Sequence, residues 1–363
     1  MLNYLFTSEC VTDGHPDKIC DQIADAILDE ALKKDPYSHM AVECTIKDDL
    51  VFLYGEANTK AELDYASIAL SVIRDIGYEE DYKFVTRIGK QSSEINDAVN
   101  RDEVSAGDQG MMFGYACSDN EDYMPAPVWF AQKLAKRLAE YRKEDTRIRP
   151  DGKTQVTVEY KDGKPFRIDT IIVSTQHVKE MNQTELSEVI KKEVIGKTIE
   201  PKWLDENTKY YINPSGSFTI GGSFGDSGTT GRKIVVDTYG GMGRIGGGCF
   251  SSKDPSKVDR SAAYYARYVA KNIVAHGLCD ECEIQVAYAI GMNKPVSICL
   301  RTDKSEEDNE KTLEIINKNF DFSVSNIIKE LDLRRPIYRK TANFGHFGNK
   351  EYPWEQIRKE LRR

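Results

Sequence analysis

The sequence lacks any uninterrupted apolar run long enough to cross a membrane. Such a helix needs about 18 or more apolar residues in succession, and charged side chains interrupt even the most apolar stretches here. The chain also lacks an excess of positive charge, with 50 Lys and Arg residues against 59 Asp and Glu residues and a net charge of −9. Non-specific binding to nucleic acid requires a basic surface. We therefore expect neither a membrane nor a nucleic acid as a partner.

The cysteines lack the pattern of a disulfide framework. Eight of them are scattered through apolar contexts in a long chain, with no recognisable signal peptide, which is typical of reduced thiols and a cytoplasmic location. Cys279 and Cys282 have the spacing of half a zinc site or of a redox pair. Only His276 lies near them in the sequence, so we favour structural cysteines over a metal site.

One order of elements recurs three times along the chain. Apolar periodicity predicts a helix, then a hairpin, then a second helix in each copy. The expected ranges are 16–33, 39–47 with 50–57, and 60–74; then 125–142, 155–160 with 167–177, and 183–194; then 255–276, 283–290 with 296–302, and 305–320. We therefore expect an α+β fold of three similar units around a pseudo-threefold axis.

The apolar hairpins also bear on domains and assembly. Each hairpin has an apolar strand that must be covered, so we expect helices and a partner subunit to cover the sheets. The expected units are 1–101, 102–220 and 221–363, the last containing the glycine-rich loops.

Two glycine-rich stretches, 221–233 and 246–257, end in cationic residues. Glycine lets backbone N–H groups approach an anion, and Lys or Arg supplies fixed charge, so this pattern predicts a polyphosphate site. Neither stretch is a true P-loop. Lys253 and Lys257 could lie close together, and two such charges near 4 Å repel by on the order of 1 to 4 kcal/mol unless an anion separates them. Turns between strands are the alternative interpretation.

The segment from Gly14 to Lys18 opens the first expected helix with proline at the first helical position. A helix N-terminus favours anions, so Asp17 is placed to hold Mg²⁺ and His15 to reach a phosphate oxygen. A plain helix start, with Asp17 favoured by the helix dipole, explains the same residues equally well.

Asp108 lies between glycines ahead of an apolar run. A carboxylate in that setting can bind a ribose hydroxyl, an amine or a metal, although a simple turn is the commoner reason for it. The preceding segment, 91–107, has few apolar residues and could close over a site as a lid. A passive surface loop remains the alternative.

Several of these motifs together resemble the S-adenosylmethionine synthetase family. The resemblance rests on 6–9 running into 14–18, on 107–116, and on 246–264, and it extends over nearly the whole chain. It implies synthesis of S-adenosylmethionine from ATP, L-methionine and water. In that reaction the methionine sulfur attacks ribose C5′ and displaces triphosphate, which is then hydrolysed to phosphate and diphosphate. It also implies two Mg²⁺ and one K⁺ per site, and a dimer or homotetramer with active sites at a subunit interface.

The resemblance assigns roles to individual positions. It implies Asp17 as a Mg²⁺ ligand, Asp259 in the second metal region and Glu43 as the K⁺ ligand. Catalytic roles fall on His15, Lys153, Arg232, Lys233, Lys253 and Lys257. These same residues except Lys257 would contact ATP, together with Asp108, Asp151, Gly152, Ser217, Phe218, Asp226 and Cys249. Methionine would be bound by Glu56, Gln91, Asp226 and Lys257, beneath a lid at Gln91–Gly107.

A site lined by cationic side chains suits this reaction. A thioether has no proton to remove, so catalysis must come from alignment and from stabilising charge on the departing chain. Cys249, Ser252 and Ser217 depart from the family pattern, where Ala, Gly and Arg are usual. We expect Cys249 to be a thiol close to ATP. An ATP-dependent kinase and a non-catalytic nucleotide sensor are the competing interpretations.

Overall fold

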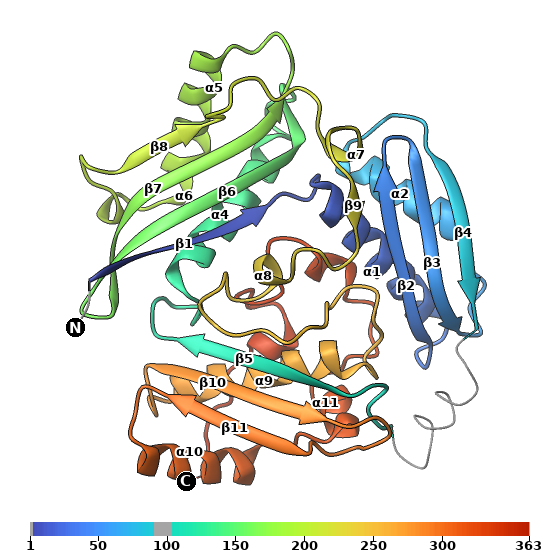
Figure 1. Ribbon diagram of the computed structural model, residues 1–363, viewed down its shortest axis with the longest axis vertical. Helices are drawn as coiled ribbons and strands as arrows, with labels where there is room; N and C mark the ends of the chain where they lie inside the picture. Colours follow the sequence, from blue (N-terminus) through green and yellow to red (C-terminus); the bar gives the residue numbers. More distant parts are fainter. Residues whose placement is uncertain (1–2, 91–103, 363) are drawn as a thin grey trace.

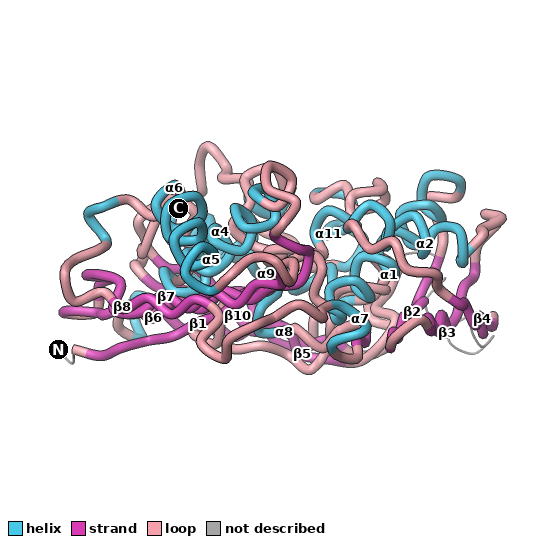
Figure 2. The backbone as a smooth tube through the Cα atoms, turned by 90° about the horizontal axis from the view of Figure 1, so that it is seen from above, coloured by secondary structure: helices cyan, strands magenta, loops and turns pink. Residues whose placement is uncertain are grey.

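The computed structural model describes residues 3–90 and 104–362, which form three β-sheets with most helices packed on one side of them (Figures 1 and 2). Each sheet contains one of the three expected hairpins, so the predicted α+β fold of three similar units is confirmed. In Figure 1 the sheets surround a central region that holds the short helix α8 (Ile234–Asp237). No helix in the described ranges is long and apolar enough to span a membrane.

The first sheet has the order β4-β3-β2-β9 and is covered by two helices. Its elements are β2 (His39–Lys47), β3 (Leu50–Asn58), β4 (Lys83–Gly89), β9 (Gly228–Thr229), α1 (Pro16–Lys34) and α2 (Tyr65–Ile76). The second helix begins at Tyr65 rather than at 60, because the Asp64 side chain caps it by accepting from the Ser67 N–H at 3.0 Å. It ends at Ile76, and the C-cap residue Gly77 adopts φ 108°.

The second sheet has the order β1-β6-β7-β8. Its elements are β1 (Tyr4–Val11), β6 (Ile148–Lys161), β7 (Lys164–His177) and β8 (Lys209–Ile212), with α4 (Ala126–Tyr141), α5 (Gln183–Val189), a π-helical turn (Ile190–Ile195) and α6 (Gly196–Thr198). The expected strand 155–160 was too short. A register shift at Ile148/Gly152 breaks the alternation of side chains that reveals a strand in a sequence, so the part of β6 before residue 155 was missed.

The third sheet has the order β11-β10-β5 and packs against a long buried helix. Its elements are β5 (Gly110–Cys117), β10 (Glu281–Tyr288), β11 (Ser297–Thr302), α9 (Val258–Ala275), α10 (Glu306–Asn319) and α11 (Val324–Glu330). The long helix was expected from residue 255 but begins at Val258. Asp254 holds the residues before it in a turn, accepting from the Ser256 N–H at 2.9 Å through its side chain.

Each sheet also takes a strand from a distant part of the chain. β1 pairs with β6, β5 pairs with β10, and β9 pairs with β2. These strands cross the boundaries expected at 101 and 220, and the domain division itself remains a prediction. The exchange brings the C-terminal end of β1 and the short strand β9 to the centre of the molecule, where β9 contacts α1 (Figure 1).

Candidate functional site

Helix α1 carries four aspartates at intervals of four residues, Asp17, Asp21, Asp25 and Asp29. That spacing places them along one side of the helix. Sixteen of the 19 residues of α1 are buried, these four included, so the carboxylates must find partners inside the protein. Of these four, only Asp17 was expected from the sequence to be a site residue, although the repeat of aspartate among Ile and Ala residues was a signal for the other three.

The first two carboxylates anchor the first glycine-rich stretch. Asp17 Oδ1 accepts from the Thr229 N–H at 3.0 Å, and Asp21 Oδ1 accepts from the Gly231 N–H at 2.8 Å. The first glycine-rich stretch and the start of helix α1 are in close contact, since a Cβ on Gly228 would lie 2.1 Å from the Pro16 carbonyl oxygen. Glycine is therefore required at 228 by the approach of the helix itself.

The other two carboxylates anchor the second stretch and the C-terminal segment. Asp25 accepts from the Ser252 N–H and the Ser251 hydroxyl, each at 3.0 Å. Asp29 accepts from the backbone N–H groups of Tyr338 and Arg339, each at 2.9 Å. The row of four aspartates thus fixes both glycine-rich stretches to helix α1, which the sequence alone did not indicate.

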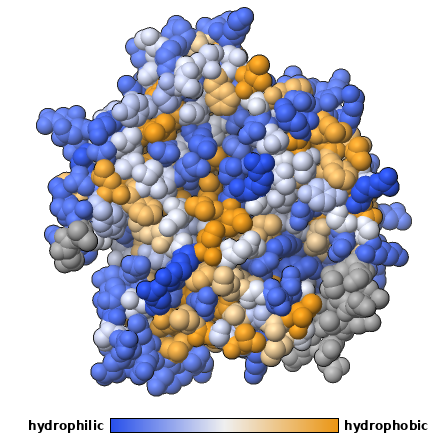
Figure 3. All heavy atoms as spheres, in the orientation of Figure 1, coloured by the Kyte–Doolittle hydropathy of each residue, from blue (hydrophilic) through white to orange (hydrophobic). Residues whose placement is uncertain are grey.

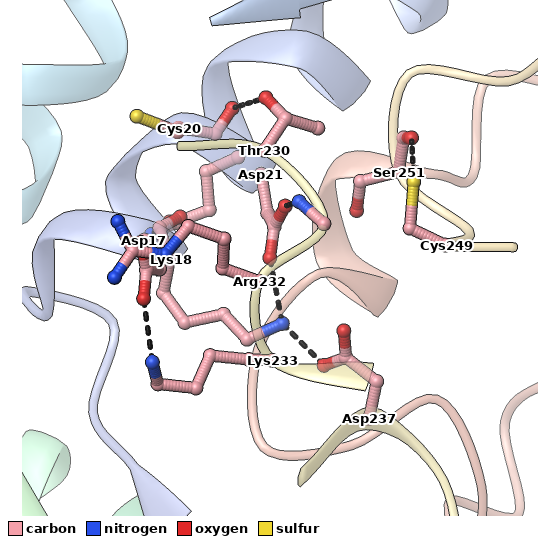
Figure 4. A network of polar contacts seen from close by, with 12 residues as sticks. Asp17, Lys18, Cys20, Asp21, Thr230, Arg232, Lys233, Asp237, Cys249 and Ser251 are labelled. Atoms are coloured by element: carbon pink, nitrogen blue, oxygen red, sulfur yellow. Dashed lines mark hydrogen bonds and ion pairs between the residues drawn. The ribbon is translucent and has the colours of Figure 1, made fainter. Parts of the chain in front are cut away.

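Cationic side chains from the first stretch converge on the start of α1 (Figure 4). Lys233 Nζ lies 2.5 Å from Asp17 Oδ2, and Arg232 Nε lies 3.5 Å from Asp17 Oδ1. His15 is the N-cap of the helix, and its Nδ1 accepts from the Asp17 N–H at 3.2 Å. Burial, together with the charge of Lys233, lowers the pKa of His15 to about 4. His15 is therefore a neutral hydrogen-bonding group at pH 7.

The second stretch supplies two more lysines, each paired with a carboxylate. Lys253 Nζ lies 2.5 Å from Asp259 Oδ2, and Lys257 Nζ lies 3.3 Å from Asp254 Oδ2. Burial opposes ionisation of Asp254, but the charge of Lys257 and contacts with His39 outweigh it and hold the pKa of Asp254 well below its usual value. The repulsion expected between the two lysines is thus already relieved by carboxylates, without a bound anion.

The second sheet contributes a third group of predicted residues. Lys153 Nζ on β6 lies 3.4 Å from Glu9 Oε2 on β1, and the positive charge of Lys153 helps to lower the pKa of His15. The neighbouring Gly152 carbonyl accepts from the Thr12 N–H at 2.9 Å. Asp151 is buried and accepts from the Gly222 N–H at 2.8 Å. Burial raises the pKa of Asp151 to about 6.

Cys249 lies where the two glycine-rich stretches meet. A Cβ on Gly231, which has φ 79°, would lie 2.6 Å from Cys249 Sγ. Burial raises the pKa of the Cys249 thiol, although the charge of Lys253 acts in the opposite direction. The thiol therefore lies close to the cationic residues of both glycine-rich stretches, and it is largely protonated at neutral pH.

Several other predicted residues have no direct contact with Asp17 or Lys233 in the part of the chain that the structure describes. Glu56, Asp108, Ser217 and Asp226 are exposed, and no hydrogen bond or ion pair between described residues joins them to Asp17 or Lys233. The backbone N–H of Phe218 donates to His177 Nε2 at 3.2 Å. Glu43 lies on β2, and its charge helps to raise the pKa of Cys249. Gln91 and most of the expected lid lie outside the described residues.

The carboxylates fit a hard divalent cation that is held partly by substrate. Within residues 3–90 and 104–362, no group of three or more His, Cys, Asp or Glu side chains is placed to hold a metal. Asp17 and Asp259 belong to separate ion pairs. Mg²⁺ keeps several waters and is commonly bound by one or two carboxylates and by phosphates, so a single aspartate at each position would suit it.

Family models match almost the whole chain. The N-terminal, central and C-terminal domains of S-adenosylmethionine synthetase match residues 3–100, 103–218 and 220–356. An S-adenosylmethionine synthase of Clostridium tetani is 52% identical, over 98% of this chain and 97% of the relative. A synthase of Staphylococcus epidermidis is 50% identical over 98% and 96%, and one of Sorangium cellulosum is 50% identical over 98% and 88%.

Proposed function

Because the chain belongs to the S-adenosylmethionine synthetase family and is a methionine adenosyltransferase, we propose that it joins the methionine sulfur to ribose C5′ of ATP. The departing group is the whole triphosphate, which the same site then hydrolyses to phosphate and diphosphate. The observation that carries this proposal is that the two glycine-rich stretches, which bear Arg232, Lys233 and Lys253, are both attached to helix α1, with Lys233 and Arg232 paired to Asp17 at its start.

The cations perform the catalysis that this reaction needs. Negative charge grows on the triphosphate as the C5′–O bond breaks, and fixed positive groups stabilise it. Lys233, Lys253 and Lys257 are held in position by Asp17, Asp259 and Asp254, so substrate phosphates gain contacts to side chains already ordered. Neutral His15 donates a hydrogen bond toward the departing oxygen, and Lys153 and Arg232 contact the phosphates.

Metal ions would share this work. Asp17 and Asp259 would hold two Mg²⁺, which neutralise phosphate charge when bound, and Glu43 would hold K⁺. Methionine would contact Glu56, Gln91, Asp226 and Lys257, while Asp108, Asp151, Gly152, Ser217, Phe218 and Cys249 would surround the nucleotide, beneath a lid at 91–107.

We extend the proposal to self-association and to a cytoplasmic location. Large apolar side chains are exposed on strands of all three sheets, among them Leu5 on β1, Phe52 on β3 and Met111 on β5. Figure 3 shows apolar residues gathered across the centre of the face that Figure 1 presents. A second subunit on this face would bury them in a dimer or homotetramer and could bring Glu56 and Asp226 to a shared site. Sedimentation of a monomer at micromolar concentration would contradict this assembly.

Product analysis tests the reaction. Incubation with ATP and methionine should give sulfonium, phosphate and diphosphate in equal amounts. An ATP analogue with nitrogen bridging the β and γ phosphates should give sulfonium while the imidotriphosphate accumulates intact. Formation of ADP, or of sulfonium together with AMP, would contradict displacement of the whole triphosphate.

A further inference from the structure

The segment that carries Arg232 and Lys233 is attached to one turn of α1 at both of its ends (Figure 4). At its start, the Gly231 N–H donates to Asp21 Oδ1 at 2.8 Å. At its end, Asp237 forms an ion pair with Lys18 Nζ. Lys18 and Asp21 also pair with each other, at 2.9 Å, so both attachments meet in a single cluster.

This cluster is sealed from solvent. Lys18 and Asp21 have no exposed surface, and Asp237 is 3% exposed. His346, also fully buried, lies 3.8 Å from Asp237 Oδ1, and burial keeps the pKa of His346 well below its usual value. A buried Lys cation requires such partners, because desolvation of an unpaired charge is costly. These side chains cannot touch substrate, so any effect on the reaction must act through their neighbours.

The segment between Gly231 and Asp237 is too short to be stable by itself. Helix α8 is a single turn, Ile234–Asp237, in which the Asp237 N–H donates to the Lys233 carbonyl at 2.9 Å. One turn is not stable alone, since helix nucleation is unfavourable and needs tertiary contacts. Lys233 is the N-cap of this turn, and its side chain reaches Asp17, the residue next to Lys18.

We propose that Lys18, Asp21 and Asp237 form a buried clamp that positions Lys233, and with it Arg232, for contact with the substrate's phosphates. The three are positioning residues. The clamp fixes the backbone of 231–237 at both ends and so sets where the Lys233 ammonium lies relative to Asp17. This inference rests on the proposed function, because it assumes that Lys233 contacts the triphosphate.

The test removes the C-terminal attachment and measures steady-state kinetics. Asp237→Ala should lower kcat/KM for ATP by about 10- to 100-fold, because small displacements of a catalytic group can cost that much, while KM for methionine stays unchanged. Asp237→Asn keeps the shape and an acceptor for Lys18, so its loss should be smaller. If the Ala variant does not fold, the Asn variant and Asp21→Asn provide the measurement.

A matched control variant separates a loss of Lys233 positioning from a general loss of folding stability. Glu355 is equally buried and pairs with Arg267 and Lys271, at 3.0 and 2.7 Å, away from the glycine-rich stretches. Glu355→Gln should lower the unfolding temperature and leave KM for ATP unchanged. If Glu355→Gln and Asp237→Ala reduce kcat/KM for ATP equally, the clamp has no specific role.

A double-mutant cycle with Lys233→Met decides whether the clamp acts through that residue. In the Lys233→Met background, Asp237→Ala should add less than about a threefold further loss, since residues that act as a unit are non-additive. Losses that multiply fully would overturn the inference while leaving the proposed function intact. If Lys233→Met itself has no effect, the proposed role of Lys233 fails, and the inference fails with it.

Discussion

Asp25 on α1 and Arg260 on α9 form a two-point ion pair with no solvent exposure. Their Nη1–Oδ1 and Nη2–Oδ2 distances are 2.8 and 2.6 Å. Arg260 Nη1 also donates to the Lys253 carbonyl at 3.0 Å. The pair joins α1, which covers the first sheet, to α9, which packs against the third sheet. It also holds the backbone of Lys253, a proposed catalytic residue.

Breaking this pair should cost much of the protein's stability. Arg260→Met leaves the Asp25 carboxylate buried without its charge partner, and removing one member of such a pair costs about 3 to 5 kcal/mol. Urea unfolding should show the loss as a lower midpoint. The comparison variant is Glu185→Gln, which removes the exposed partner of Arg147. It should scarcely change the midpoint, and a similar fall in both variants would contradict a special role for the buried pair.

Lys253→Met should impair catalysis more than folding. Lys253 pairs with Asp259, and in the proposed function it contacts the phosphates of ATP. Loss of one group that stabilises developing charge lowers kcat by about 10²- to 10³-fold, measured as sulfonium formed at saturating ATP and methionine. Replacing Lys257 as well should deepen the loss. Lys192→Met, at a side chain that is 82% exposed, serves as the control, and full activity in the Lys253 variant would rule out the role.

Asp151 should make stability depend on pH. Burial raises its pKa from 3.8 to about 6, so the folded protein keeps a proton that the unfolded chain releases. The resulting stabilisation is fully present below pH 3.8 and is lost as the pH rises to about 6, a change of about 3 kcal/mol.

Asp151→Asn removes this titration while keeping an acceptor for the Gly222 N–H. The wild-type free energy of unfolding, relative to the variant, should therefore fall between pH 4 and pH 7, as measured by urea titrations. Asp162→Asn, at an exposed turn, should show no such difference. A constant difference for Asp151 would contradict the raised pKa.

Cys249 should react slowly with iodoacetamide at pH 7. Burial raises the pKa of its thiol, and the thiolate is the reactive form. Labelling, followed by peptide mapping, should accelerate as pH rises and should slow when ATP is present. The exposed Cys299 is an internal comparison, since its labelling should not respond to ATP. Equal labelling of Cys249 with and without nucleotide would mean that it lies away from the ATP site.

Local sequence determined the three hairpins and most of the helices that accompany them. Alternation and turn residues were sufficient for the hairpins at 39–58 and 281–302, because neighbouring residues decide pleating and turns. Glycine next to cations predicts phosphate binding, and that part of the site remains a prediction. The resemblance to a family added the reaction, which no periodicity contains.

Only the tertiary structure decided which distant segments meet. Strands β1, β5 and β9 join sheets far from their neighbours in sequence, and Lys18 meets Asp237 across 219 positions. The four-residue spacing of Asp17, Asp21, Asp25 and Asp29 placed them on one face, but it could not say what that face would touch. Such pairings depend on how the whole chain packs, since a buried charge is stable only where the completed fold supplies its partner.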